Sequence, residues 1–179
     1  MSWVPKSALL VMASSWLVFS SAGWAATTPA GMRGTPSELL YNFAMLSHPP
    51  AQRVRNTYHI CAFTEDVGYL DPVALTSQKI QNVRVALRPL QAIAEVKHCN
   101  LLYIRHFVPQ KPLELQQLIQ KEVVLTVVDA DNRFAGYGHI VISKQSQRYQ
   151  FDLRMQPAKQ AGIVFDARLM KLATNIINN

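Results

Sequence analysis

The chain is poor in the residues that most catalytic and metal sites require. Its 179 residues include two cysteines, five histidines and 11 acidic residues. No Walker A loop, G-x-S-x-G elbow or H-E-x-x-H pair occurs in it. DADNRFAGYGH departs from a calcium loop because Arg133 and Phe134 replace an oxygen ligand and a glycine. Glu65, Asp66 and Asp71 are interpreted as a solvated loop. We therefore predict no enzyme activity, no metal and no cofactor.

Long apolar runs are also scarce, and the exception lies at the N-terminus. One basic residue precedes an apolar run from Ala8 to Phe19, and Gly23 and Ala25 stand at the −3 and −1 positions of a cleavage site. This layout predicts a secretory signal peptide over residues 1–25. A retained membrane anchor is the alternative, but the run is shorter than the roughly 20 residues that a spanning helix needs.

The remainder of the chain is long enough for a single folded domain with its own core. Residues 26–34 are small and turn-prone, so we expect a mobile lead-in to a domain over residues 35–179. Lys and Arg number 18 against 11 acidic residues. Such a balance suits an acidic protein face or anionic lipid headgroups as partners, but we interpret the charge in the first place as ordinary solvated surface. The basic residues are scattered and form no nucleic-acid recognition motif, so we expect no nucleic acid among the partners.

The two cysteines occur in similar settings, each at or near an apolar run and close to a histidine. An exported protein enters an oxidising compartment, where paired thiols normally form a disulfide. This favours a bond between Cys61 and Cys99. A zinc site that includes His59 and His98 is an alternative, although adjacent residues of a strand point to opposite faces, which separates His98 from Cys99. Free thiols are the remaining alternative.

Strands and helices alternate over the first two thirds of the domain, which predicts an α/β fold with three layers, a mainly parallel β-sheet flanked by helices. TPSE at 35–38 is a capping box that opens the first helix. The predicted strands are 58–63, 82–87, 100–105 and 122–129. The predicted helices that follow the first one are 71–80, 89–97 and 111–121.

The C-terminal part changes character and adds a β-hairpin and helices. Alternating apolar residues over 139–155 flank a polar KQSQ turn, which is typical of a hairpin. A short helix is predicted at 157–162, with Gly162 as its left-handed terminator. Asp166 is the predicted N-cap of a last helix that continues through Ile177.

Several stretches that together cover nearly all of the exported chain point to a family. They are LLYNFAMLSHPP, HICAF, HCNLLYI, LTVVD followed by FAGYGHIVI, and YQFDLRMQPAKQAGIVFDARLMKLA. In order and spacing they resemble the YfiR family of periplasmic regulators. The resemblance implies an α/β domain in the periplasm whose matching cysteines can pair, in agreement with a Cys61–Cys99 bond.

The resemblance further implies a function. It predicts a protein that binds and represses the periplasmic domain of an inner-membrane diguanylate cyclase. It also predicts that an OmpA-like outer-membrane lipoprotein sequesters this repressor. By position it points to His139, Asp152, Ala158 and Ile176 as partner-binding residues. Whether the protein forms a homodimer stays open. The alternatives are a periplasmic small-molecule binding protein, with a crevice at the carboxyl ends of the strands, and an adaptor of a sensor kinase.

Overall fold

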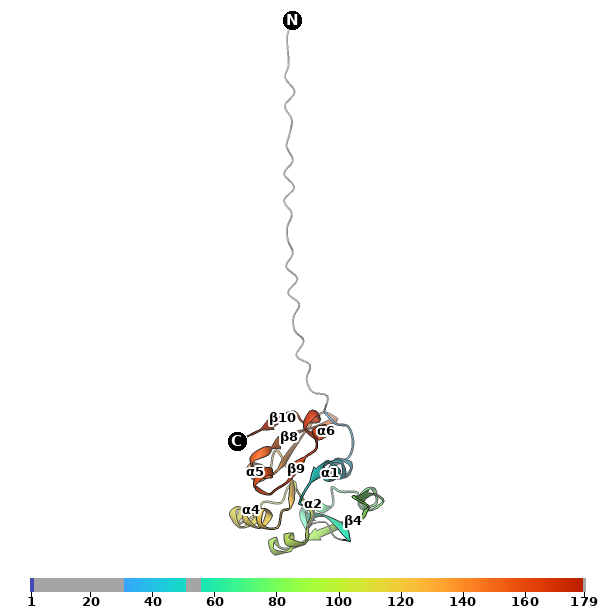
Figure 1. Ribbon diagram of the computed structural model, residues 1–179, viewed down its shortest axis with the longest axis vertical. Helices are drawn as coiled ribbons and strands as arrows, with labels where there is room; N and C mark the ends of the chain where they lie inside the picture. Colours follow the sequence, from blue (N-terminus) through green and yellow to red (C-terminus); the bar gives the residue numbers. More distant parts are fainter. Residues whose placement is uncertain (2–30, 51–55, 179) are drawn as a thin grey trace.

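A computed structural model describes residues 31–50 and 56–178, together with Met1 (Figure 1). The predicted signal peptide over 1–25 lies outside the described residues except for Met1, and so do residues 26–30 of the lead-in. Within the lead-in, Met32 exchanges backbone hydrogen bonds with Tyr149. In the described part of the chain, no helix has the length and apolar character needed to cross a bilayer.

An eight-stranded sheet forms the centre of the domain, with the strand order β10-β8-β7-β6-β5-β2-β4-β3. Strands β4, β2, β5, β6 and β7 run parallel, whereas β3 and β8 run antiparallel to their neighbours β4 and β7. A separate two-stranded sheet pairs β1 with β9. The strands are β1 (Ser47–His48), β2 (Thr57–Phe63), β3 (Lys79–Ile80), β4 (Val83–Leu90), β5 (Leu101–Ile104), β6 (Leu125–Asp129), β7 (Ile140–Gln145), β8 (Arg148–Arg154), β9 (Val164–Phe165) and β10 (Asn175–Ile177).

Three helices begin at the N-cap residues that the sequence predicts. The Thr35 hydroxyl accepts from the Glu38 backbone N–H, and Glu38 reaches back to the Thr35 N–H, which completes the capping box of α1. Asp71 caps α3 and Asp166 caps α6. The helices are α1 (Pro36–Met45), α2 (Thr64–Val67), α3 (Pro72–Thr76), η1 (Ile93–His98), α4 (Pro112–Lys121), η2 (Ala135–Tyr137), α5 (Met155–Gln160) and α6 (Ala167–Leu172).

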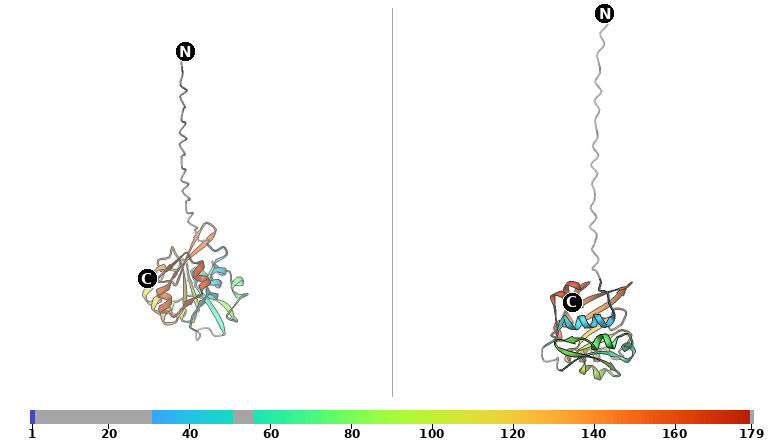
Figure 2. Two further views of the ribbon diagram at one scale, coloured as in Figure 1. Left: turned by 45° about the horizontal axis from the view of Figure 1, so that its top comes forward. Right: turned by 90° about the vertical axis from the view of Figure 1, so that its right-hand side faces the viewer.

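Each face of the sheet has its own apolar core. Tyr58 and Ile60 of β2 pack with α1, which lies across the sheet in the right-hand view of Figure 2, and with residues of α3, α5 and α6. Cys61 and Phe63 point to the opposite face and pack with η1 and α4. Because β2 is buried on both faces, helices are needed on both sides of it. The predicted three-layer α/β fold is confirmed.

The chain departs from the predicted elements at two helix ends. The helix predicted at 71–80 ends at Thr76, and its last two residues form β3. The last helix ends at Leu172, and Asn175–Ile177 form β10, which pairs in parallel with β8. Thr174 and the two isoleucines that follow are β-branched and favour extended backbone, and β8 has an edge with which they can pair.

Candidate functional site

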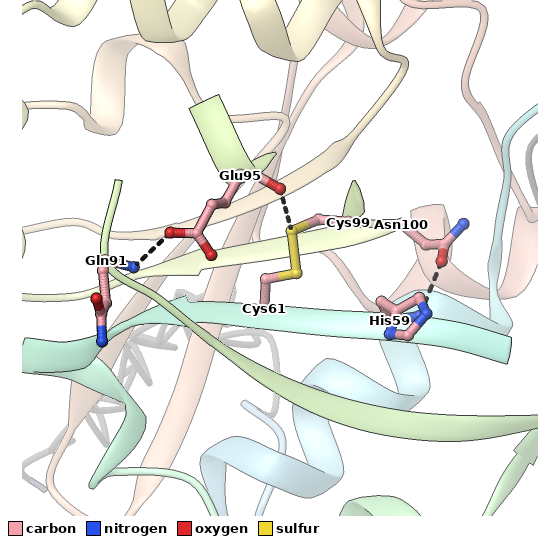
Figure 3. Close-up of a disulfide and its surroundings, with 6 residues drawn as sticks. All are labelled: His59, Cys61, Gln91, Glu95, Cys99 and Asn100. Carbon is pink, nitrogen blue, oxygen red and sulfur yellow. Dashed lines mark hydrogen bonds between the residues drawn. A yellow bond between two sulfur atoms is a disulfide. The ribbon is translucent and has the colours of Figure 1, made fainter. Parts of the chain in front are cut away.

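Cys61 and Cys99 form a disulfide, as the sequence predicts (Figure 3). Their Cα atoms lie 5.8 Å apart. The bond is possible because β2 and β5 are adjacent parallel strands and Cys99 lies two residues ahead of β5. Both side chains are buried. Since the bond uses both sulfur atoms, neither cysteine is available as a thiolate ligand for zinc.

The four residues predicted to bind a partner lie in one region but differ in accessibility. Ile176 on β10 is 43% exposed, and Asp152 on the neighbouring strand β8 is partly exposed. His139 and Ala158 are each 1% exposed. The structure thus brings Asp152 and Ile176 onto paired strands at one end of the sheet. His139 and Ala158 expose almost no surface, and a role of any of the four residues in partner binding stays a prediction.

His139 links the sheet to the C-terminal segment. Its Nδ1 accepts a hydrogen bond from the Thr126 backbone N–H at 3.0 Å, and its ring bonds to the Pro157 backbone in α5. Burial lowers the pKa of His139 from its ordinary value of 6.5 to about 4, although the bond to Pro157 acts in the opposite direction. The neutral imidazole therefore connects β6, β7 and α5.

Asp152 holds the edge strand in place. Its Oδ1 accepts a hydrogen bond from Asn175 Nδ2 at 2.8 Å. The Thr174 backbone N–H donates to the Phe151 carbonyl nearby, also at 2.8 Å. These contacts fix the start of β10 against β8, so that Ile176 is presented from a paired strand rather than from a helix.

An apolar hollow of about 620 Å³ lies beside this strand pair. Its lining includes Met155, Ile163, Phe165 and Met170, from α5, β9, α6 and the turn between α5 and β9. Val164 on its rim is 64% exposed. Exposed apolar side chains around a hollow are a common feature of protein–protein binding sites. We name Ile176, Val164 and this hollow the C-terminal surface.

A second group of polar side chains lies at the carboxyl ends of the central strands. Asp66 follows β2 and is fully buried, and its carboxylate accepts hydrogen bonds from the backbone N–H groups of Arg105, His106 and Phe107 at 2.7–3.2 Å. Asn132 follows β6, and its Nδ2 donates to the carbonyls of Arg105 and Phe107 at 2.9 and 2.8 Å. Two buried side chains thus fix the loop after β5 from both sides.

This arrangement corrects the interpretation of Asp66 as a solvated loop residue, and the role of Asn132 was likewise missed. A sequence signal did exist, because each residue lies just beyond the carboxyl end of a predicted parallel strand. The carboxyl ends of parallel strands meet at one edge of a sheet, where polar side chains gather. What the sequence does not show is which backbone groups these two side chains contact.

The fixed loop borders an open crevice. One part, of about 640 Å³, is lined by Phe63, Phe107 and Ile93 among others, and a smaller part of about 240 Å³ contains Arg105 and Asp129. The Arg105 guanidinium lies 4.2 Å from the centre of the Tyr69 ring and 3.9 Å from Asp129. Burial raises the pKa of Asp129. The crevice lies where strand order reverses, between β2 and β5, which is the usual ligand position in open α/β sheets.

Comparison with solved structures supports the fold. The ABC domain from Streptococcus pneumonia, solved in complex with L-Trp, superposes with a TM-score of 0.51 at 8% sequence identity. The match covers 80% of the present chain and 61% of that structure. At this identity the likeness concerns the fold alone. Among curated proteins, no significant match is found.

The family comparison covers most of the domain. The family model described as YfiR/HmsC-like matches residues 36–174, from the first residue of α1 to the residue before β10. The match includes both cysteines of the disulfide, Asp66 and Asn132, and the Val164 part of the C-terminal surface, whereas Ile176 lies beyond it. The chain belongs to the YfiR/HmsC-like family.

Proposed function

We propose that this protein is a periplasmic regulator that binds the periplasmic domain of an inner-membrane diguanylate cyclase and represses it. Repression lowers the output of cyclic di-GMP and with it biofilm formation. The observation that carries the proposal is the family match over residues 36–174, because the family is regulatory rather than catalytic. An OmpA-like outer-membrane lipoprotein that sequesters the regulator is the second partner that the proposal expects.

Repression requires the regulator to bind the inactive state of the cyclase more tightly than the active state. A difference of about 1–3 kcal/mol between the two affinities is typical of such coupling. The regulator needs no chemistry of its own for this. It needs a stable surface that fits one arrangement of the partner.

The C-terminal surface is the part of the molecule that we assign to the cyclase. Ile176 and Val164 expose apolar area, and the hollow beside them offers space for a partner side chain. Asp152 and His139 act indirectly, Asp152 by holding β10 and His139 by holding α5. This division of roles separates the residues that contact the partner from those that shape the surface.

The binding experiment compares two apolar truncations of similar exposure. Ile176→Ala is expected to weaken binding to the isolated periplasmic domain of the cyclase by tenfold or more while the melting temperature stays unchanged, since hot-spot truncations typically cost about 2 kcal/mol. Leu113→Ala, in the first turn of α4 and 62% exposed, does not line the hollow; it is the control and should bind like the wild type. Equal affinities for the two variants would place the cyclase site elsewhere.

The cellular experiment tests repression itself. Deletion of the regulator in a strain that expresses the cyclase is expected to raise cyclic di-GMP and surface attachment. Re-expression of the wild type should restore the original level, and Ile176→Ala should restore it less well. An unchanged nucleotide level after deletion would contradict repression.

A second candidate function is the binding of a small molecule in the crevice at the carboxyl ends. The specific observation that favours it is the loop after β5, which Asp66 and Asn132 hold in one conformation beside an open cavity. A site fixed in advance loses less entropy when a ligand binds. The ABC domain of similar fold was solved with L-Trp, so L-Trp is the first ligand to test by calorimetry, with Phe107→Ala as the variant expected to lose binding.

A further inference from the structure

The edge of the sheet opposite β10 presents basic residues on a single face. In the register of the strands, Lys79 of β3 pairs with Arg84 of β4, and Ala86 pairs with His59 of β2. Paired residues of neighbouring strands point to the same face, and so do alternate residues along one strand. Lys79, Arg84, Arg88 and His59 therefore share one face of the sheet. None of the four is buried.

The histidine at the end of η1 lies beside this group of residues. After burial, the charges of Arg88 and His98 are the causes that lower the pKa of His59, so both lie close to it. We name Lys79, Arg84, Arg88, His59 and His98 the basic face. It occupies β3 and the amino-terminal part of β2 and β4 up to the disulfide, since Arg88 is the register partner of Cys61.

Acidic side chains do not neutralise the strand positions of this face. The residues of β2, β3 and β4 on the same side, all within the described chain, include no Asp or Glu. Glu95 of η1 is close in sequence to His98, but its carboxylate accepts a hydrogen bond from the backbone N–H of Gln91 (Figure 3). It also accepts one from the backbone N–H of Ala92. The strand positions of the basic face therefore carry charged groups of one sign, which is positive.

The composition of the face favours a lipid surface over a protein. Protein interfaces need a core of apolar or aromatic side chains. The large apolar side chains that are exposed in the described chain all lie outside the basic face. Between its cations lie Thr57 and Ala86, which are small. Attraction to a charged bilayer needs neither apolar anchors nor a pocket, only cations that can approach the headgroups together.

We infer that the basic face binds a membrane surface that carries anionic phospholipid headgroups. The inference rests on the proposed function, in which the partner is an inner-membrane protein. In the strand order, β3 and β10 are the two edges of the sheet, so a protein docked through the basic face keeps its C-terminal surface clear of the bilayer. Docking would concentrate the regulator near its membrane partner without using the surface that binds it.

The experiment measures co-sedimentation of the exported, disulfide-bonded protein with vesicles of phosphatidylcholine, with and without phosphatidylglycerol. The wild type is expected to bind only the vesicles with phosphatidylglycerol, and less at high salt. Arg84→Ser with Arg88→Ser should reduce this partition about 30-fold, since each of the two arginines contributes about fivefold. Arg133→Ser with Arg148→Ser removes the same charge from exposed positions elsewhere and is the matched control.

The outcomes separate the two proposals. Arg84→Lys with Arg88→Lys keeps the charge and should keep the binding, which excludes a loss through misfolding. No binding by the wild type, or equal weakening by the two serine pairs, would overturn the inference. The vesicles contain no cyclase, so this result does not depend on repression. If the wild type does not co-sediment with the vesicles but binds an acidic protein through Arg84 and Arg88, the basic face is a protein-binding surface and the inference is wrong.

Discussion

Acidification should loosen the C-terminal segment through His139. The imidazole is buried and neutral, and its Nδ1 accepts from the Thr126 N–H at 3.0 Å. A proton on Nδ1 would place two donors face to face and put a charge in an apolar core. The folded protein therefore resists protonation, which is why the pKa of His139 falls to about 4.

The direction of the effect follows from the two pKa values. The unfolded chain takes up the proton near pH 6.5 and the folded chain only near pH 4. The contribution of the neutral histidine to the free energy of unfolding is thus complete above pH 6.5 and is lost as the pH falls towards 4. The loss amounts to about 2 kcal/mol between about pH 7.5 and pH 5, and to about 3 kcal/mol once both states are protonated.

The assay is urea unfolding of the wild type and of His139→Asn at several pH values. Asparagine keeps an acceptor but does not titrate, so the stability gap between the two proteins isolates the histidine. We expect the gap to be largest near pH 7 and to shrink by about 2 kcal/mol at about pH 5. Asp129 and Asp166 also have shifted pKa values, but both proteins share them. His106→Asn, at an exposed histidine, is the control. A gap that does not change with pH would refute the reasoning.

Three further predictions concern the rest of the fold. Replacing Cys61 and Cys99 together by alanine should lower the free energy of unfolding by about 4 kcal/mol, because the bond closes a loop of 38 residues; a drop below about 1 kcal/mol in urea unfolding would contradict this. Asp66→Ala should cost about 3 kcal/mol or more, since three backbone N–H groups lose their acceptor, and faster amide exchange in the loop after β5 is the local measurement. Tyr58→Phe should leave stability unchanged or raise it by about 1 kcal/mol in thermal unfolding, because the buried Tyr58 hydroxyl has no hydrogen-bond partner among the described residues; a clear loss of stability would contradict this.

Elements with strong local signals were predictable from the sequence. The capping box at Thr35 and the aspartate caps at Asp71 and Asp166 start helices because each satisfies backbone N–H groups within its own first turn. The buried strands could be recognised from their apolar runs, since such a strand needs apolar residues on both faces. The disulfide was predictable from the predicted export combined with only two cysteines, and this prediction needed no knowledge of their distance.

Structure that depends on residues far away in the sequence was harder to predict. An apolar face over Leu169–Ile177 fits a helix, but Asn175–Ile177 pair with the open edge of β8, and the sequence does not reveal that this edge is available. The four residues predicted to bind a partner rest on resemblance alone, and their role stays a prediction. Burial of His139 and Ala158 separates them from Ile176, and burial depends on what the rest of the chain packs against each position.

The sequence by itself determined the α/β class, the order of the main strands and helices along the chain and the identity of the disulfide, because these follow from local hydrogen bonding, alternation and composition. Only the tertiary structure decided which polar groups meet. Asp66 and Asn132 are 66 positions apart in the chain, and both contact the loop after β5 because β2, β5 and β6 are neighbours in the sheet. Strand order also placed the basic face and the C-terminal surface at opposite edges, since adjacency in a sheet is set by crossover connections rather than by distance along the chain.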